Sequence, residues 1–162
     1  MIFGNWASDR NLSIQSNITI SLPVSEVKFG QMNISDTKNT TAGNPAALII
    51  RNDGNAEVNI SVNFTHLFTS VANPSDYFKY KIRNHSADSC YIGSGTQTTW
   101  AQAPIITTAT INRLNFTSGY QTGCSNTSVD IFVQVPPDES SGDKSSTITF
   151  TSSLAEWGLG AD

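Results

Sequence analysis

The chain has 162 residues, long enough for one domain with a sizeable hydrophobic core. Only 14% of the residues are charged and the formal net charge is −4, so neutral polar groups must hydrate the surface, and nucleic acid and anionic membranes are poor partners. No apolar run approaches the roughly 20 residues of a membrane span, and the first residues lack the basic start and apolar stretch of a signal peptide. We therefore expect either a cytosolic protein or the mature form of an exported one.

The first predicted element is a strand over Leu12–Leu22 with one apolar face. That face comprises Leu12, Ile14, Ile18, Ile20 and Leu22, with Ser16 as its one polar member. Eleven residues is long for a sandwich strand, and Pro23 follows without a turn sequence that could fold a hairpin. We therefore expect the apolar face to be buried in a neighbouring subunit. The alternative is the commoner arrangement, in which this segment is the first strand of its own domain.

Further strand signals follow along the chain, separated by turn-forming sequences such as NDGN and ANPSD. They cover Glu26–Ile34, Ala46–Arg51, Val58–Phe64, Tyr77–Arg83, Ile105–Asn112, Val129–Val135 and Ser146–Ser152. No segment of helical length carries an apolar stripe of period 3.6. The sequence predicts an all-β fold, a two-sheet antiparallel sandwich of the immunoglobulin-like or jelly-roll kind.

Two hairpins and one bend are predicted within this pattern. The NDGN turn at 52–55 is expected to join the strands before and after it into one hairpin, and the acidic loop 136–145 to join the last two strands into another. In the second hairpin, alternate residues from Val129 to Val135 would oppose Ile148 and Phe150. At Gly30 the apolar residues change from odd to even positions, which is typical of a bulge or bend.

N-glycosylation is indicated by acceptor sequences of the form N-x-S/T. There are nine, none with proline in the middle, at Asn11, Asn17, Asn33, Asn39, Asn59, Asn63, Asn84, Asn115 and Asn126. Roughly four would arise by chance from this composition. Asn59 and Asn63 share the polar face of one predicted strand, so sugars there would point to solvent. The pattern favours an extracellular, glycosylated protein; the alternative is a polar strand face that is never modified.

Cys90 and Cys124 are the two cysteines of the chain, and neither lies in a CxxC motif or beside a histidine. In an exported protein such a pair most often forms a disulfide, which would contribute on the order of 3 to 4 kcal/mol. Two buried free thiols are the alternative. Both cysteines fall in the least regular region, 88–123, which we interpret as a strap across one end of the sandwich.

Catalytic chemistry finds little support in the sequence. The two histidines, His66 and His85, have no motif around them, and no GxSxG or phosphate-binding loop occurs. The acidic loop, with Asp138, Glu139 and Asp143, lacks the spacing of a calcium site and is better explained as a solvated loop. Trp6, Trp100 and Trp157 are expected to be core or half-buried aromatics rather than sugar-stacking platforms. We expect no enzymatic activity, catalytic residue, cofactor or metal.

Two stretches are similar to segments of secreted archaeal surface proteins with immunoglobulin-like sandwiches: LIIRNDGNAEVNISV at 48–62 and VPPDESSGDKSSTITFT at 135–151. The layout, an alternating N-terminal strand before a sequon-rich sandwich, resembles archaeal extracellular filament subunits such as threads and bundling pili, and their bacterial TasA-like and camelysin-like relatives. This resemblance implies that the N-terminal strand of one subunit completes the sandwich of the next. The chain departs from type IV pilins and archaellins because it lacks their long apolar N-terminal helix.

These observations predict an N-terminal extended arm or donor strand over 1–24, a β-sandwich domain over 25–153 and a short C-terminal tail over 154–162. We expect a structural subunit of an extracellular glycosylated filament that assembles head to tail by donor-strand complementation. Its partners would be copies of itself and N-linked glycans, with neither nucleic acid nor a membrane span. The alternative is a self-contained secreted module for adhesion, carbohydrate or protein binding, or a surface layer.

Overall fold

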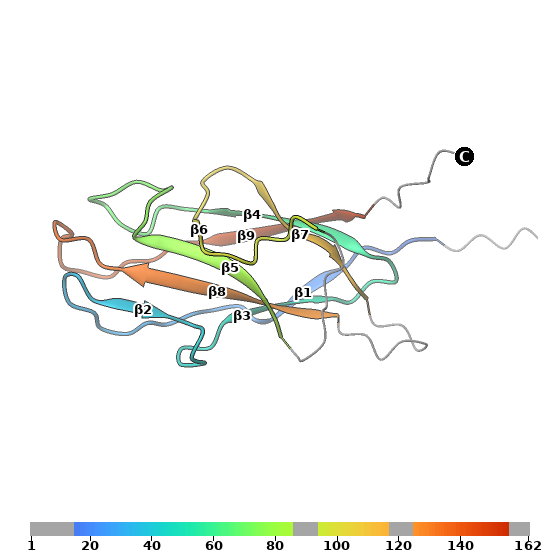
Figure 1. Cartoon of the computed structure of the whole chain (residues 1–162), viewed down its shortest axis with the longest axis horizontal. Helices are drawn as coiled ribbons and strands as arrows, with labels where there is room; N and C mark the ends of the chain where they lie inside the picture. Colours follow the sequence, from blue (N-terminus) through green and yellow to red (C-terminus); the bar gives the residue numbers. More distant parts are fainter. Residues whose placement is uncertain (1–14, 86–93, 117–124, 156–162) are drawn as a thin grey trace, which may run out of the picture.

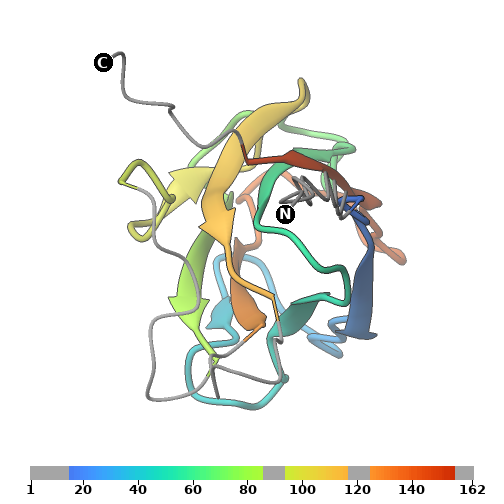
Figure 2. The same cartoon turned by 90° about the vertical axis from the view of Figure 1, so that its right-hand side faces the viewer.

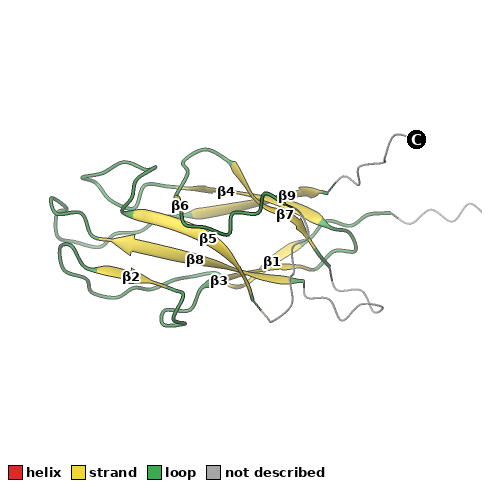
Figure 3. Ribbon diagram, in the orientation of Figure 1, coloured by secondary structure: helices red, strands yellow, loops and turns green. Residues whose placement is uncertain are grey.

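The computed structural model describes residues 15–85, 94–116 and 125–155, which form an all-β sandwich of two antiparallel sheets (Figures 1 and 3). In chain order the strands of these ranges are β1 (Ile20–Val24), β2 (Thr37–Asn39), β3 (Leu48–Asn52), β4 (Val58–Phe64), β5 (Phe78–Asn84), β6 (Ala101–Gln102), β7 (Thr108–Leu114), β8 (Asn126–Gln134) and β9 (Ile148–Leu154). The predicted fold class is confirmed. The short strands β2 and β6 were not expected from the sequence.

The two sheets differ in size. The larger has the order β1-β3-β8-β5-β6, and β2 pairs with β8 at Phe132–Gln134, beyond the end of β3. The smaller has the order β7-β4-β9. Seen along the long axis in Figure 2, the smaller sheet lies over the larger one. Most consecutive strands from β3 onward therefore alternate between the sheets.

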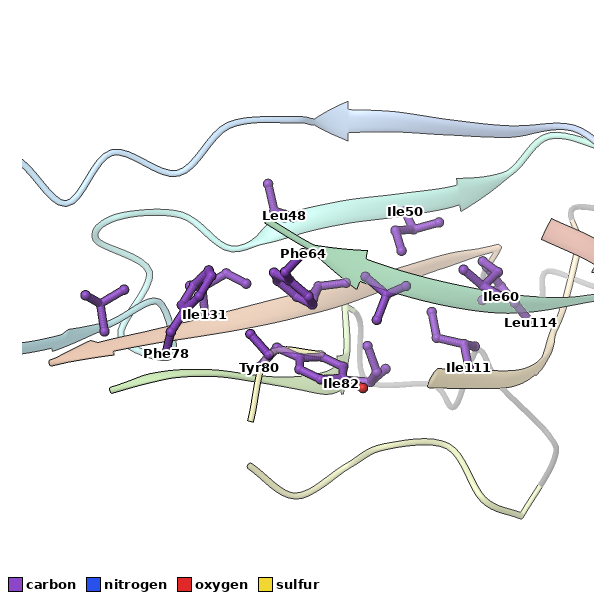
Figure 4. Close-up of a cluster of buried hydrophobic side chains, with 14 of the residues drawn as sticks. Leu48, Ile50, Ile60, Phe64, Phe78, Tyr80, Ile82, Ile111, Leu114 and Ile131 are labelled. Atoms are coloured by element: carbon purple, nitrogen blue, oxygen red, sulfur yellow. The ribbon is translucent and has the colours of Figure 1, made fainter. Parts of the chain in front are cut away.

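The core lies between the sheets and follows the period-two pattern of the strands. In β4 the residues Val58, Ile60, Val62 and Phe64 are buried, while the residues between them are half-buried on the outer face. They meet the inward side chains of β5 and β8 from the other sheet (Figure 4). The ring of Phe64, for example, lies 5.4 Å from that of Phe78 between centroids. Alternation therefore predicts correctly which side chains of the central strands face inward.

Neither predicted hairpin exists. The NDGN turn connects β3, which pairs with β1 and β8, to β4, which pairs with β7 and β9 in the other sheet. Buried Asn52 shapes this crossing, because its Oδ1 accepts from Gly54 N at 3.0 Å and its Nδ2 donates to Ala56 O at 2.8 Å. The loop 136–145 likewise carries the chain from β8 to β9 in the opposite sheet. The turn sequences specify a reversal of the chain, and burial decides to which sheet it returns.

The predicted strand Glu26–Ile34 is also wrong. Residues 25–33 form no strand and pair with no other strand of the described chain. Val27, Phe29 and Met32 are nevertheless partly buried against the core. Because these residues form no strand, the predicted bulge or bend of a strand at Gly30 is wrong as well, although the φ of 66° at Gly30 lies in the left-handed region that favours glycine. Alternation thus identified a segment with one apolar side, but a strand also requires a partner.

One long side of the sandwich is closed by the segment 94–104, which runs between β5 and β7 (Figure 2). Gln97 links both sheets: its N–H donates to Thr110 O of β7 at 2.9 Å, and its C=O accepts from Ile82 N of β5 at 2.7 Å. Further along, Phe64 N donates to Pro104 O at 2.8 Å. The described part of the predicted strap therefore follows a side of the sandwich rather than crossing an end.

Candidate functional site

The opposite long side of the sandwich is open. The larger sheet borders it with β1 and the segment 25–34, and the smaller sheet borders it with β9. Between them lies a groove of about 1360 Å³. Pockets for small molecules are usually about 300–1000 Å³. The size and elongated border of this groove suit a segment of polypeptide better than a small ligand.

The floor of the groove is apolar and belongs to both sheets. Its apolar lining includes Val27, Phe29, Met32, Leu67, Phe68, Phe78, Ile131, Val133, Ile148 and Phe150. Several of these side chains pack against the core while remaining only partly buried, among them Phe29, Ile148 and Phe150. Leaving such a surface in water is unfavourable, and an exposed apolar floor with a polar rim is typical of a place where another chain binds. The expected opposition of β8 to Ile148 and Phe150 thus occurs across the groove and not within a hairpin.

The β9 strand presents a free edge to this groove. Thr65 N donates to Thr147 O and Ala155 N donates to Glu57 O, both at 2.9 Å, which marks the odd-numbered residues of β9 as the hydrogen-bonded partners of β4. In an antiparallel ladder the backbone groups of the intervening residues point the other way. The N–H and C=O groups of Ile148, Phe150 and Ser152 therefore face away from β4. No strand in the described ranges pairs with them there.

The segment 25–34 forms the facing border and is held by one side chain. Lys38 Nζ donates to Phe29 O at 2.7 Å and to Gln31 O at 3.1 Å. No backbone–backbone hydrogen bond joins residues 25–32 to another part of the described chain. The Lys38 ammonium group and apolar packing therefore hold this border in place, and the peptide groups of residues 25–32 form no strand pairing with the described chain.

The loop 136–145 forms the rim of the groove at one end and is anchored by Glu139. Its carboxylate accepts from the hydroxyl and the N–H of both Thr69 and Ser70, at 2.6–3.2 Å, and lies 2.5 Å from Lys144 Nζ. Lys144 first, and then the Ser70 hydroxyl, lower the pKa of Glu139 well below its usual range. The expectation of a solvated acidic loop is therefore wrong for Glu139, although Asp138 and Asp143 are exposed. No group of three or more His, Cys, Asp or Glu side chains that could hold a metal occurs among the described residues.

The predicted interface residues fall into three groups. Leu12 and Ile14 lie outside the described residues. Ile20 begins β1, pairs with Asn52 of β3 and packs against the core of its own chain, so it is not available to a neighbour. Ile18 and Leu22 are exposed, at 38% and 39%, and Leu22 lines the groove.

The boundary of the predicted arm therefore needs correction. Thr19 O and Asn17 O already accept from Asp53 N and Asn55 N, so residues 17–24 belong to the sandwich of their own chain. A bulge between Ser21 and Val24 also interrupts the predicted unbroken strand. Alternation showed that the segment has one apolar face, but it did not identify the strand that receives it. At the other boundary, Leu154 is still part of β9.

The described glycosylation acceptors are exposed or half-buried, and Asn11 lies outside the described residues. In four of them the side-chain oxygen is already engaged: Asn17 Oδ1 accepts from Thr19 Oγ1, Asn39 Oδ1 from Thr41 N, Asn59 Oδ1 from Arg113 N, and Asn115 Oδ1 from Phe116 N. A glycan is attached to the amide nitrogen, so these bonds are compatible with modification. Among the described acceptors, Asn33 is the one that borders the groove.

Other predicted features lie elsewhere or have structural roles. Cys90, Cys124, Trp6 and Trp157 fall outside the described residues. Trp100 is half-buried, but on the outer face of the larger sheet instead of in the core, with its ring 5.7 Å from that of Phe132 and 4.7 Å from Lys81 Nζ.

The histidines make contacts that do not assemble a reactive site. His66 Nδ1 accepts from Asn73 N at 2.8 Å, which holds a loop in place. His85 Nδ1 lies 3.1 Å from Ser128 Oγ, but Ser128 is buried. The nearest acid along β8, Asp130, is fully buried and bound instead to Arg83 and Thr40, each at 2.9 Å. The expectation that the protein is not an enzyme stays a prediction.

No protein-family model, curated protein sequence or solved structure matches the chain. Within the described ranges, no helix has the length and apolar character needed to cross a membrane. The groove and the two sheet edges that border it are therefore the features of the described chain that bear on function.

Proposed function

We propose that the protein is a structural subunit of an extracellular, glycosylated filament, in which an N-terminal segment of one copy fills the open groove of the next. The observation that carries this proposal is the apolar groove of about 1360 Å³ beside the free edge of β9. An exposed sheet edge next to an apolar floor is unstable towards aggregation until another strand covers it. Strand addition supplies backbone hydrogen bonds to the edge and apolar side chains to the floor.

The segment available for donation is shorter than the alternation alone suggested. Because residues 17–24 pair within their own chain, the donated part must come from residues 1–14, with Leu12 and Ile14 on its apolar face. Burial of these two side chains would contribute roughly 3–6 kcal/mol before the entropy of ordering the segment is subtracted. Backbone pairing adds about 0.5–1.5 kcal/mol for each hydrogen bond.

The arrangement of the two ends favours an open polymer over a closed dimer. Residues 15–19 lie beside the loop 52–55 at one end of the sandwich, whereas the rim loop 136–145 lies at the other end (Figure 1). The described chain begins at one end and the rim loop of the groove lies at the other, so an arm attached at residue 15 would make a heterologous contact with the groove of a second copy. Such a contact repeats as an open filament where the rotation between copies does not close a ring.

Glycosylation and the disulfide belong to the same proposal, since both require an exported chain. Outward-facing acceptors on β4, Asn59 and Asn63, leave the groove free. Mass spectrometry of native protein, with thiol labelling under denaturing, non-reducing conditions, tests both features. A bare chain of 17.4 kDa, or reaction of both Cys90 and Cys124 with the label, would contradict them.

The decisive experiment removes the proposed donor while leaving the sandwich complete. Deletion of residues 1–14 keeps β1 and its pairing with β3, whereas a longer deletion would damage the fold itself. We expect the full chain to form filaments in electron micrographs. The truncated chain should form no polymer, although its strand content in circular dichroism should be unchanged. Filaments from the truncated chain, or a monomeric full chain, would refute the proposal and favour the self-contained binding module.

A further inference from the structure

We infer that the β9 strand is the acceptor edge for the donated segment, and the directions of the strands support this assignment. The inference rests on the proposed function and adds the partner strand, the direction of pairing and the side-chain face. Three features support it: where β1 begins, where β9 ends, and which backbone groups of β9 have no partner among the described residues.

The beginning of β1 and the end of β9 lie at the same end of the molecule. Asn17 O accepts from Asn55 N, and Ala155 N donates to Glu57 O, so both are attached to the same short loop. The two strands therefore run in opposite directions, as Figure 1 also shows. The described chain begins at this end, beside the loop 52–55, whereas the rim loop 136–145 lies at the other end.

A second copy can insert its arm from the rim-loop end if both copies point the same way along the long axis. In that arrangement the inserted arm has the direction of β1 and is antiparallel to β9. We propose that residues 1–14 of the neighbouring copy pair antiparallel with β9 and extend the smaller sheet from β7-β4-β9 to a fourth strand. At about 3.3 Å per residue, 14 residues could span roughly 46 Å, more than the approximately 23 Å of a seven-residue strand.

The backbone and the side chains agree in this pairing. Ile148, Phe150 and Ser152 offer their peptide groups to the new strand, and Ile148 and Phe150 also point into the groove. Residues opposite one another in an antiparallel pair share a face, so Leu12 and Ile14 would enter the groove. The odd-numbered residues, including Asn11 with its glycosylation acceptor, would face outward beside Thr149 and Thr151.

Cysteine pairs test the assignment directly. The outward residues Thr149 and Thr151 would sit in non-hydrogen-bonded pairs with the donor, where Cα atoms lie about 4.5 Å apart and a disulfide can form. We would combine Ser13→Cys with Thr149→Cys or with Thr151→Cys. The matched control combines Ser13→Cys with Ala109→Cys, an exposed outward position on β7, the other edge strand of the same sheet. Each single variant gives the background from Cys90 and Cys124.

Mild oxidation should produce a ladder of covalent oligomers in non-reducing electrophoresis for at least one β9 pair, and the ladder should be absent for the β7 pair. Filaments in micrographs without a ladder from either β9 pair, or with an equally strong ladder from the β7 pair, would overturn the assignment to β9 and leave the filament proposal intact. Absence of filaments from the unsubstituted chain would refute both.

Discussion

The two long sides of this sandwich differ in how their sheet edges are covered. On the closed side, the segment 94–104 connects β5 and β7 through the N–H and the C=O of Gln97, and β6 extends the larger sheet. On the open side, the free edge of β9 and the segment 25–34 face each other across an apolar groove, and no described strand lies between them. The described residues therefore cover one side of the sandwich and place no strand on the other.

We therefore expect folding and assembly to depend on different sides of the sandwich. A side that the chain covers itself contributes to the stability of the isolated subunit, whereas an open apolar side contributes fully only when another chain fills it. Substitutions on the closed side should act mainly on folding. Substitutions on the open side should act weakly on folding and strongly on assembly.

The largest expected effect comes from a matched pair of isoleucines on the two edge strands of the smaller sheet. Ile111 of β7 is buried, and its replacement by alanine should lower the free energy of unfolding by about 2–5 kcal/mol. Ile148 of β9 is only partly buried, so Ile148→Ala should cost roughly 1–2 kcal/mol in the isolated subunit. Urea unfolding of both variants measures the difference.

For assembly, the order of the two effects should be reversed, so that the substitution at Ile148 has the larger one. Ile148→Ala should shorten or abolish filaments in micrographs under conditions where folded Ile111→Ala subunits still form them. Equal losses of stability in the two variants would show that the open side is already covered in the subunit.

A smaller effect is expected at the border of the groove. Lys38→Met removes the two hydrogen bonds to Phe29 O and Gln31 O and should reduce stability by about 1–2 kcal/mol. It should also increase amide exchange at 25–34. Lys28→Met is the control, because Lys28 is exposed and pairs only with exposed Glu26, so it should change stability by less than about 0.5 kcal/mol. Similar behaviour of both variants would show that Lys38 does not hold this border.

The smallest expected effect is a pH dependence at the rim of the groove. The pKa of Glu139 is lower in the folded chain than its ordinary value of 4.5, so its contribution to stability is complete above that pH and is lost as the pH falls below it. Thermal unfolding between about pH 7 and pH 3 should therefore show a steeper decline for the natural chain than for Glu139→Gln. Asp53 and Asp76, whose pKa values are also lowered, contribute equally to both. Parallel curves would contradict the role of Glu139.

The sequence predicted a strand best where one face of that strand is buried and the other faces solvent. The bounds of β4 agree with the prediction of Val58–Phe64, because its alternating side chains divide cleanly between core and surface. Pairing partners could not be predicted in the same way. The NDGN turn is present, yet β3 and β4 join different sheets, since a turn constrains a few residues and not the surface against which the next strand packs.

The candidate site was predicted only in part. The apolar face of Leu12–Leu22 led to the hypothesis of an inserted strand, but residues 17–24 bind β3 and the loop 52–55 of their own chain. The groove and the free edge of β9 have no local signal, because they result from the order of strands in two sheets. The anchoring of Glu139 was missed for a similar reason, since Thr69 and Ser70 are 70 and 69 residues away in the sequence.

The sequence alone predicts the all-β class and the inward positions of the central strands. Both features depend on the period of side chains along an extended backbone, which is a local property. Only the tertiary structure decided which sheet each strand joins, which side of the sandwich is closed and which edge remains free. Those features depend on contacts between residues far apart in the chain, where many pairings satisfy the same alternation and the burial of the whole core selects one of them.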